Sequence, residues 1–144
     1  HRDRPGMGLM VPHTTAAALV SENRSLAFPS TVDSIPTCED QEDLVAMSTT
    51  AARQAMEVVQ NCQIIVAIEL LSAAHGLWWR QEKEPTVQLG RGSQVALDVI
   101  EKLTATDHRC PADDIASLTQ AVRDGTILAA VEAELGPLPE VSCG

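Results

Sequence analysis

The feature that most constrains the fold of this 144-residue chain is a helical pattern with no proline or glycine from about Asp40 until Gly76, which can continue to Arg80. About forty helical residues at roughly 1.5 Å each span about 60 Å, whereas a compact globule of this chain length is only about 40 Å across. The middle, residues 64–71, is apolar on every face, so other helices must surround it, and Glu69 within it should be buried and paired. We therefore expect one long helix that extends beyond its own domain, in a chain that is not a free monomer.

The rest of the chain also has helical patterns, and no segment alternates like a strand. Pro29 and Pro36 bracket a loop that reaches Glu39, where we expect no regular structure. Aromatic residues make up only 2% of the chain, so small aliphatic side chains must fill the core, which favours close helix packing. We expect an all-α fold in two parts, a pocket loop with the long helix (residues 1–80) and a small helical C-terminal segment (residues 81–144). The shorter helices are predicted over residues 7–26, 94–104, 112–123 and 126–135.

The charge and the cysteines exclude several classes of function. The net charge is −10, whereas nucleic-acid phosphates and anionic membrane surfaces bind basic faces. We expect no nucleic-acid partner and no membrane, since the apolar run is short for a membrane span and contains Glu69 and His75. His108 and Cys110 lack a second ligand pair, so no metal site is expected. The cysteines are far apart, which indicates free thiols in a reducing, cytoplasmic compartment: Cys38, Cys62, Cys110 and Cys143.

Carboxylates lie where the long helix is expected to begin. Glu42 and Asp43 would occupy its first turn, after a cap at Asp40 or Thr37, where the helix dipole stabilises negative charge. One interpretation is simple electrostatics at a helix start. The other is an ionised acid that faces a pocket and holds an ammonium group or takes a proton. His13 lies on a helical pattern and can be a core or interface residue with satisfied hydrogen bonds, but it is also a polar side chain that we place near the loop bracketed by Pro29 and Pro36.

Several sequence blocks occur in the order found in a known enzyme family. The chain resembles the aromatic amino acid lyases and aminomutases over residues 8–80, and within them the C-terminal part of the histidine ammonia-lyases. The resemblance beyond residue 80 is loose, although residues 111–115 are similar to the family's final helices. The blocks that resemble the family are TAAALVSENR (15–24), VDSIPT (32–37), QED (41–43), LVAMS (44–48), VAIELL (66–71) and LWWR (77–80).

The resemblance implies a long-helix bundle in the core of a homotetramer, with active sites built from several subunits. It also implies a methylidene-imidazolone electrophile, made from an internal Ala-Ser-Gly, that captures the substrate before a β-proton is removed and ammonia leaves. No Ala-Ser-Gly occurs in this chain. We therefore expect a companion chain with the N-terminal lyase portion to supply the electrophile, unless the activity has been lost.

The resemblance also assigns roles to particular residues. Glu42 corresponds to the acid that histidine lyases use against the substrate, with Gln41 beside it, and Cys38 corresponds to a position that lines the substrate pocket. His13 would contact the substrate, although a Gln is usual there, and Leu44 stands where a His is usual. These features indicate elimination of ammonia from an aromatic L-amino acid, with L-histidine giving urocanate. The alternatives are an aminomutase, a lyase for another amino acid, or an inactive helical scaffold.

Overall fold

The computed structural model describes residues 9–104 and 111–139, and within these ranges the chain is built from α-helices. Its only pairing of extended backbone in the described ranges is an isolated bridge between Thr37 and Glu42. The expected all-α fold is confirmed. The elements are α1 (Met10–Leu26), the 3-10 turn η1 (Ser30–Val32), α2 (Ser48–Lys83), α3 (Arg91–Leu103), α4 (Pro111–Arg123) and α5 (Thr126–Leu135).

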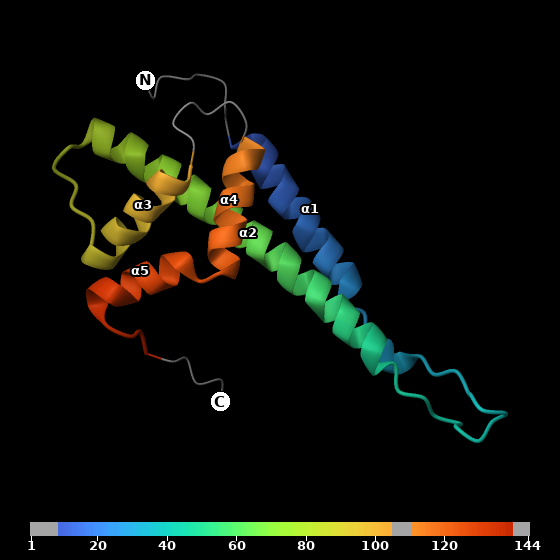
Figure 1. Ribbon diagram of the computed structural model, residues 1–144. Helices are drawn as coiled ribbons and strands as arrows, with labels where there is room; N and C mark the ends of the chain where they lie inside the picture. Colours follow the sequence, from blue (N-terminus) through green and yellow to red (C-terminus); the bar gives the residue numbers. More distant parts are fainter. Residues whose placement is uncertain (1–8, 105–110, 140–144) are drawn as a thin grey trace.

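The long helix α2 is the spine of the molecule. Its 36 residues span about 54 Å, which is longer than the diameter of about 40 Å expected for a compact globule of this chain length. The prediction of one over-long helix is therefore confirmed. Figure 1 shows α1 antiparallel to α2, α4 packed against the middle of α2, and α3 and α5 on the side of α4 away from α1. The loop that joins α1 to α2 projects past the ends of both helices.

The start of α2 differs from the prediction. The helix begins at Ser48 and not near Asp40, and its N-cap residue Met47 makes no side-chain capping bond. The reason is a turn just before it, in which Cys38, Glu39 and Asp40 all have positive φ and so leave the right-handed helical conformation. Glu42 and Asp43 therefore precede the helix and do not occupy its first turn, so the helix-dipole argument for them was wrong. The 3-10 turn η1 likewise lies inside a loop that we expected to be irregular.

The hydrophobic core surrounds only the second half of α2. All of the residues that α2 buries lie between Ala67 and Trp78, and all but Ile68 belong to a core cluster with residues of α3 and α4. The helix α1 packs along α2, with Glu22 and Asn23 near its C-terminal end beside Asn61. The core draws on residues from both sides of position 80, and the division into residues 1–80 and 81–144 stays a prediction. The core cluster consists of Ala67, Leu71, Ala74, Trp78, Leu97, Ile100 and Leu118.

One expectation about an α2 side chain is corrected. Glu69 is exposed and not buried, because it lies on the side of α2 that faces away from the core. The neighbouring tryptophans near the end of α2 differ in burial. Trp78 is buried, whereas Trp79 is 64% exposed and Lys83 Nζ lies 5.9 Å from the centre of its ring. The described residues thus leave the side of α2 that bears Glu69 uncovered.

Among the described residues, α2 is the one helix that is long and apolar enough to cross a membrane, by length and composition alone. The core helix of a water-soluble protein passes the same test, and 28% of the most apolar window of α2 is buried inside this chain. The expectation of no membrane partner stays a prediction.

Candidate functional site

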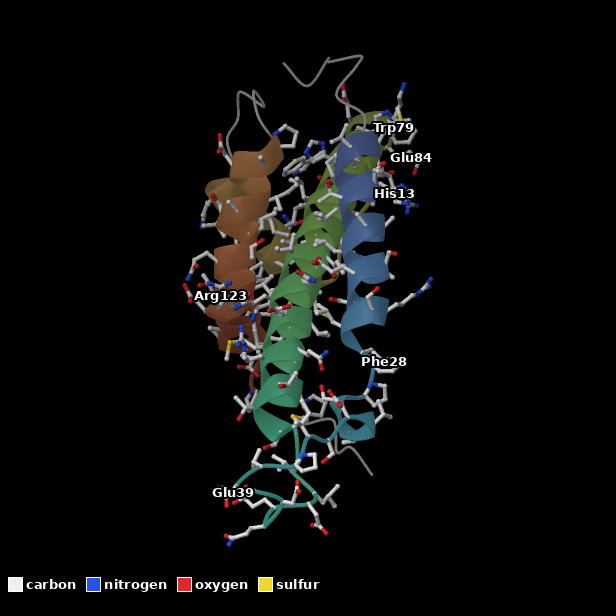
Figure 2. All side chains as sticks on the ribbon, turned by 90° about the vertical axis from the view of Figure 1, so that its right-hand side faces the viewer. His13, Phe28, Glu39, Trp79, Glu84 and Arg123 are labelled. Atoms are coloured by element: carbon white, nitrogen blue, oxygen red, sulfur yellow. The ribbon has the colours of Figure 1, made fainter. Side chains whose placement is uncertain are left out.

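Three of the four candidate residues lie together in the loop between α1 and α2. Cys38, Gln41 and Glu42 belong to a turn at residues 37–42, which is followed by five further loop residues before α2 begins. In Figure 2 this loop forms the lower end of the molecule, and the labelled Glu39 marks its tip. All three side chains are exposed. The sequence thus predicted that these residues cluster, although it placed part of them on a helix.

Hydrogen bonds between Thr37 and Glu42 close the turn. The Thr37 N–H donates to the Glu42 carbonyl at 3.1 Å, and the Glu42 N–H donates to the Thr37 carbonyl at 3.3 Å. The Thr37 hydroxyl also donates to Oε2 of Glu42 at 2.6 Å. Farther out, the Val45 N–H donates to the Ser34 hydroxyl at 3.0 Å. The backbone pair fixes the turn, and the hydroxyl bond orients the Glu42 carboxylate relative to it.

The tip of the turn is strained. Cys38, Glu39 and Asp40 have φ values of 53°, 56° and 66°, which is the left-handed region. Each such residue without the freedom of glycine costs roughly 1–2 kcal/mol. Consecutive residues of this kind persist only where their surroundings hold them, and strained backbone of this sort is concentrated at functional sites. Among the described residues, Cys38, Glu39 and Asp40 are the non-glycine residues with positive φ, so backbone strain of this kind is concentrated in this turn.

The chemistry available in the turn is that of carboxylates. Glu39, Asp40, Glu42 and Asp43 lie within five positions, and all are exposed. Such a group can balance the charge of an ammonium ion or accept a proton from a bound molecule. Thr37 makes Glu42 distinct from the other three, because its hydroxyl holds the carboxylate in one orientation. Within residues 9–104 and 111–139, no three His, Cys, Asp or Glu side chains are arranged to hold a metal ion.

His13, the fourth candidate, is far from the turn. It is exposed near the N-terminal end of α1, whereas the turn lies beyond the opposite end of that helix (Figure 2). The helix extends about 20 Å along its axis from His13 to Leu26 alone. The expectation that His13 lies near the loop is therefore wrong within this chain. His108 and Cys110, considered above for a metal site, lie outside the described residues.

Sequence reasoning missed the supporting residues of the site. Thr37 was considered only as a helix cap, and Ser34 was not singled out, yet these two hydroxyls make the side-chain bonds that tie the loop together. The signal that was available is the run of small polar residues between Pro29 and Gln41, a composition typical of turns that bond side chain to backbone. No sequence signal marked the three left-handed residues, since none of them is glycine or asparagine.

Comparisons with known proteins agree on one family. A family model described as aromatic amino acid lyase matches residues 2–102. The histidine ammonia-lyase of Gloeobacter violaceus is 47% identical over 135 residues, which are 91% of this chain and 25% of that protein. The histidine ammonia-lyase of Symbiobacterium thermophilum is 45% identical over 133 residues, with the same two coverages.

Solved structures give the same result for the fold. The crystal structure of histidine ammonia-lyase from Trypanosoma cruzi superposes with a TM-score of 0.79 at 33% identity, covering 92% of this chain and 25% of that one. A tyrosine aminomutase mutant structure superposes with a TM-score of 0.82 at 28% identity, covering 96% of this chain and 26% of that one. The chain thus spans about a quarter of the length of the relatives that it matches.

Proposed function

The chain belongs to the aromatic amino acid lyase family, and from this premise we propose that it is the C-terminal portion of an ammonia-lyase that converts L-histidine to urocanate. The observation that supports this most directly is the identity of 45–47% to two histidine ammonia-lyases over 91% of the chain. The share of those proteins that is matched, 25%, supports a companion chain that contributes the remaining lyase portion. The exposed, unpaired thiols of Cys38 and Cys62 are compatible with a cytoplasmic location.

The contribution of this chain to the reaction would come from the turn at residues 37–42. Glu42 would act as the acid–base group or hold the substrate ammonium, with its carboxylate oriented by Thr37. Gln41 and Cys38, which are exposed on the same turn, would line the substrate pocket. His13 could contact a substrate only if another subunit brought it to a turn that is not its own.

The residues of this chain do not provide the electrophile. A methylidene-imidazolone forms from an internal Ala-Ser-Gly, and none occurs in these 144 residues. The electrophile would have to come from the companion chain. A native mass spectrum of the purified complex tests this: the expected companion is a longer polypeptide whose mass is lower by the two waters that cyclisation releases. A complex without any longer polypeptide contradicts the proposal.

Glu42→Gln in the assembled enzyme is the test of the catalytic assignment. Removing a positioned acid–base group typically lowers kcat by about 100-fold or more, and we expect this loss in urocanate formation followed by absorbance. The matched control is Glu39→Gln, which makes the same charge change at the tip of the same turn. If both variants keep full activity, Glu42 has no catalytic role. An equal loss in both indicates a general electrostatic effect of the acidic turn.

The tyrosine aminomutase superposition favours a second candidate, an aminomutase or a lyase for another amino acid. Leu44 and His13, which replace residues usual in histidine lyases, point the same way. Product analysis distinguishes these options, because a lyase gives urocanate, cinnamate or coumarate from histidine, phenylalanine or tyrosine, whereas an aminomutase gives a β-amino acid. An assembly that yields none of these from any of the three substrates would be the inactive helical scaffold.

We also propose that the complete unit is a homo-oligomer, a tetramer with α2 in its core. The support is a stripe of α2 that the described residues leave uncovered, which we call the open face and which consists of Ala55, Val59, Val66, Glu69 and Ala73. These positions follow one another at spacings of three, four or seven residues and all are exposed. That spacing places them on one side of a helix, as in helices that pack side by side.

A further inference from the structure

The contact between α1 and α2 contains a cluster of polar side chains that the proposed chemistry does not use. Nδ2 of Asn61 on α2 donates to Oδ1 of Asn23 at 2.9 Å and to Oε2 of Glu22 at 3.1 Å, both on α1. An amide NH₂ has two hydrogens, so one side chain can make both bonds. Nδ2 of Asn23 also lies 3.7 Å from Sγ of Cys62. We call the two bonds from Asn61 the Asn61 clamp.

The remaining contact surface of α1 is apolar. Pro12 is the only buried residue of α1, and Ala16, Leu19 and Leu26 are half-buried on the side of α1 that bears Asn23. Apolar contacts are not directional, so they define the register of two helices less sharply than hydrogen bonds between particular side chains do. Polar pairs between helices are the usual means of fixing register in that situation. The Asn61 clamp is thus the contact best suited to set how far α1 extends along α2.

That register matters for the loop, because α1 and α2 are its two anchors. Asn23 is four positions before Ala27, where the loop leaves α1. Beyond that point, the Ser30 hydroxyl donates to Oε1 of Gln54 at 2.6 Å, which ties the loop to α2 a second time. A slip of one helical turn would move one anchor about 5.4 Å relative to the other. The Thr37–Glu42 turn would then be displaced or lose its hydrogen bonds.

We infer that Asn61 is a positioning residue: through Glu22 and Asn23 it holds α1 in register on α2 and thereby fixes where the loop presents Glu42. The structural part of this inference concerns the chain alone, and its catalytic consequence rests on the proposed function. Two experiments keep the two parts separate.

The first experiment measures amide hydrogen exchange in the full chain. For Asn61→Ala we expect the N–H groups of Thr37, Glu42 and Val45 to exchange roughly tenfold faster, while core amides such as those of Leu71 and Leu118 are unchanged. Gln60→Ala, an exposed neighbour on α2, is the control and should leave all of these rates unchanged. Unchanged loop rates in Asn61→Ala overturn the inference, and so does an equal acceleration of loop and core.

The second experiment reverses the polarity of the clamp in the assembled enzyme. Asn61→Asp places a carboxylate against Glu22 and should lower kcat about tenfold with KM changed less than twofold. Adding Glu22→Gln supplies an amide donor to Asp at position 61, and we expect both kcat and slow loop exchange to recover. A merely local effect of position 61 on α2 would not be rescued by a change on α1, so failure of the rescue contradicts the inference. If the exchange rates recover in an assembly that makes no product with any variant, the clamp stands and the proposed function fails.

Discussion

At the scale of single residues, the Thr37 hydroxyl is the group that distinguishes Glu42 from the other acids of the turn. Replacing Thr37 by Val keeps the shape of the side chain and removes its bond to Oε2. A hydrogen bond to a charged group contributes about 1.5–3 kcal/mol, so we expect a roughly tenfold or greater loss of kcat in the assembled enzyme. Thr31→Val, at an exposed threonine of η1, is the matched control and should retain activity. Equal activities of the two variants would show that orientation of Glu42 by Thr37 is unimportant.

The left-handed residues of the turn allow a prediction of opposite sign. Glycine adopts positive φ without the steric penalty of other residues, so Glu39→Gly should stabilise the turn by about 1 kcal/mol through relief of strain. The greater conformational entropy of glycine in the unfolded chain offsets part of this gain. We expect slower amide exchange at Thr37 and Glu42. Asp43→Gly, at a residue outside the left-handed region, gains no such relief and should leave these rates unchanged or faster. The same rates in both variants would mean that the turn is not strained at Glu39.

Residue identities predicted the composition of the site and missed its conformation. Cys38, Gln41 and Glu42 were expected to lie together, and they do, because they are neighbours in a single turn. The separation of His13 from them could not be seen in the sequence, since it depends on the direction in which α1 leaves the loop. The start of α2 was misplaced for a related reason. Non-glycine residues with positive φ leave no compositional signal, so the helical pattern seemed to begin at Asp40.

At the scale of elements, two glycines have opposite structural roles. Gly76 lies within α2, is exposed, and has no atom within 4 Å of where a Cβ would be. Gly125 separates α4 from α5 and has a φ of 71°. Gly76→Ala should therefore raise the free energy of unfolding by about 0.5–1 kcal/mol through helix propensity, whereas Gly125→Ala should lower it by about 1–2 kcal/mol. Urea unfolding of the chain measures both, and equal signs would contradict this assignment.

Helix patterns located the other elements well, because their ends have local signals. The predicted α5 has the bounds that the structure shows, and α4 was predicted to within one residue at its start. The local signals are Pro111 at the start of α4 and Gly125 between α4 and α5. The exposure of Glu69 and Trp79 was not predictable in this way. An apolar run all round a helix indicates only that partners cover it, not whether these partners belong to the same chain.

At the scale of the whole molecule, the distribution of charge and apolar surface bears on assembly. The chain has a net charge of −10, which opposes association of its copies over most of its surface. The open face of α2 contains a single charge, Glu69, among Ala and Val side chains. Val59 and Val66 on this face are 55% and 40% exposed. Electrostatic repulsion therefore opposes the association of two copies least at the open face of α2, which lies outside the hydrophobic core of the chain.

Charges placed on the open face should prevent assembly without unfolding the chain. In the double variant Val59→Asp and Val66→Asp, burial of the face would require two uncompensated carboxylates per copy to leave water, which costs several kcal/mol for each. We expect the native mass of the complex to fall to that of a smaller unit, with helical content retained by circular dichroism. Leu128→Asp on α5, at a side chain that is 52% exposed, adds a similar charge to a different face and should leave the mass unchanged. Assembly that survives the double variant, or fails equally in Leu128→Asp, would place the contact between copies elsewhere than on α2.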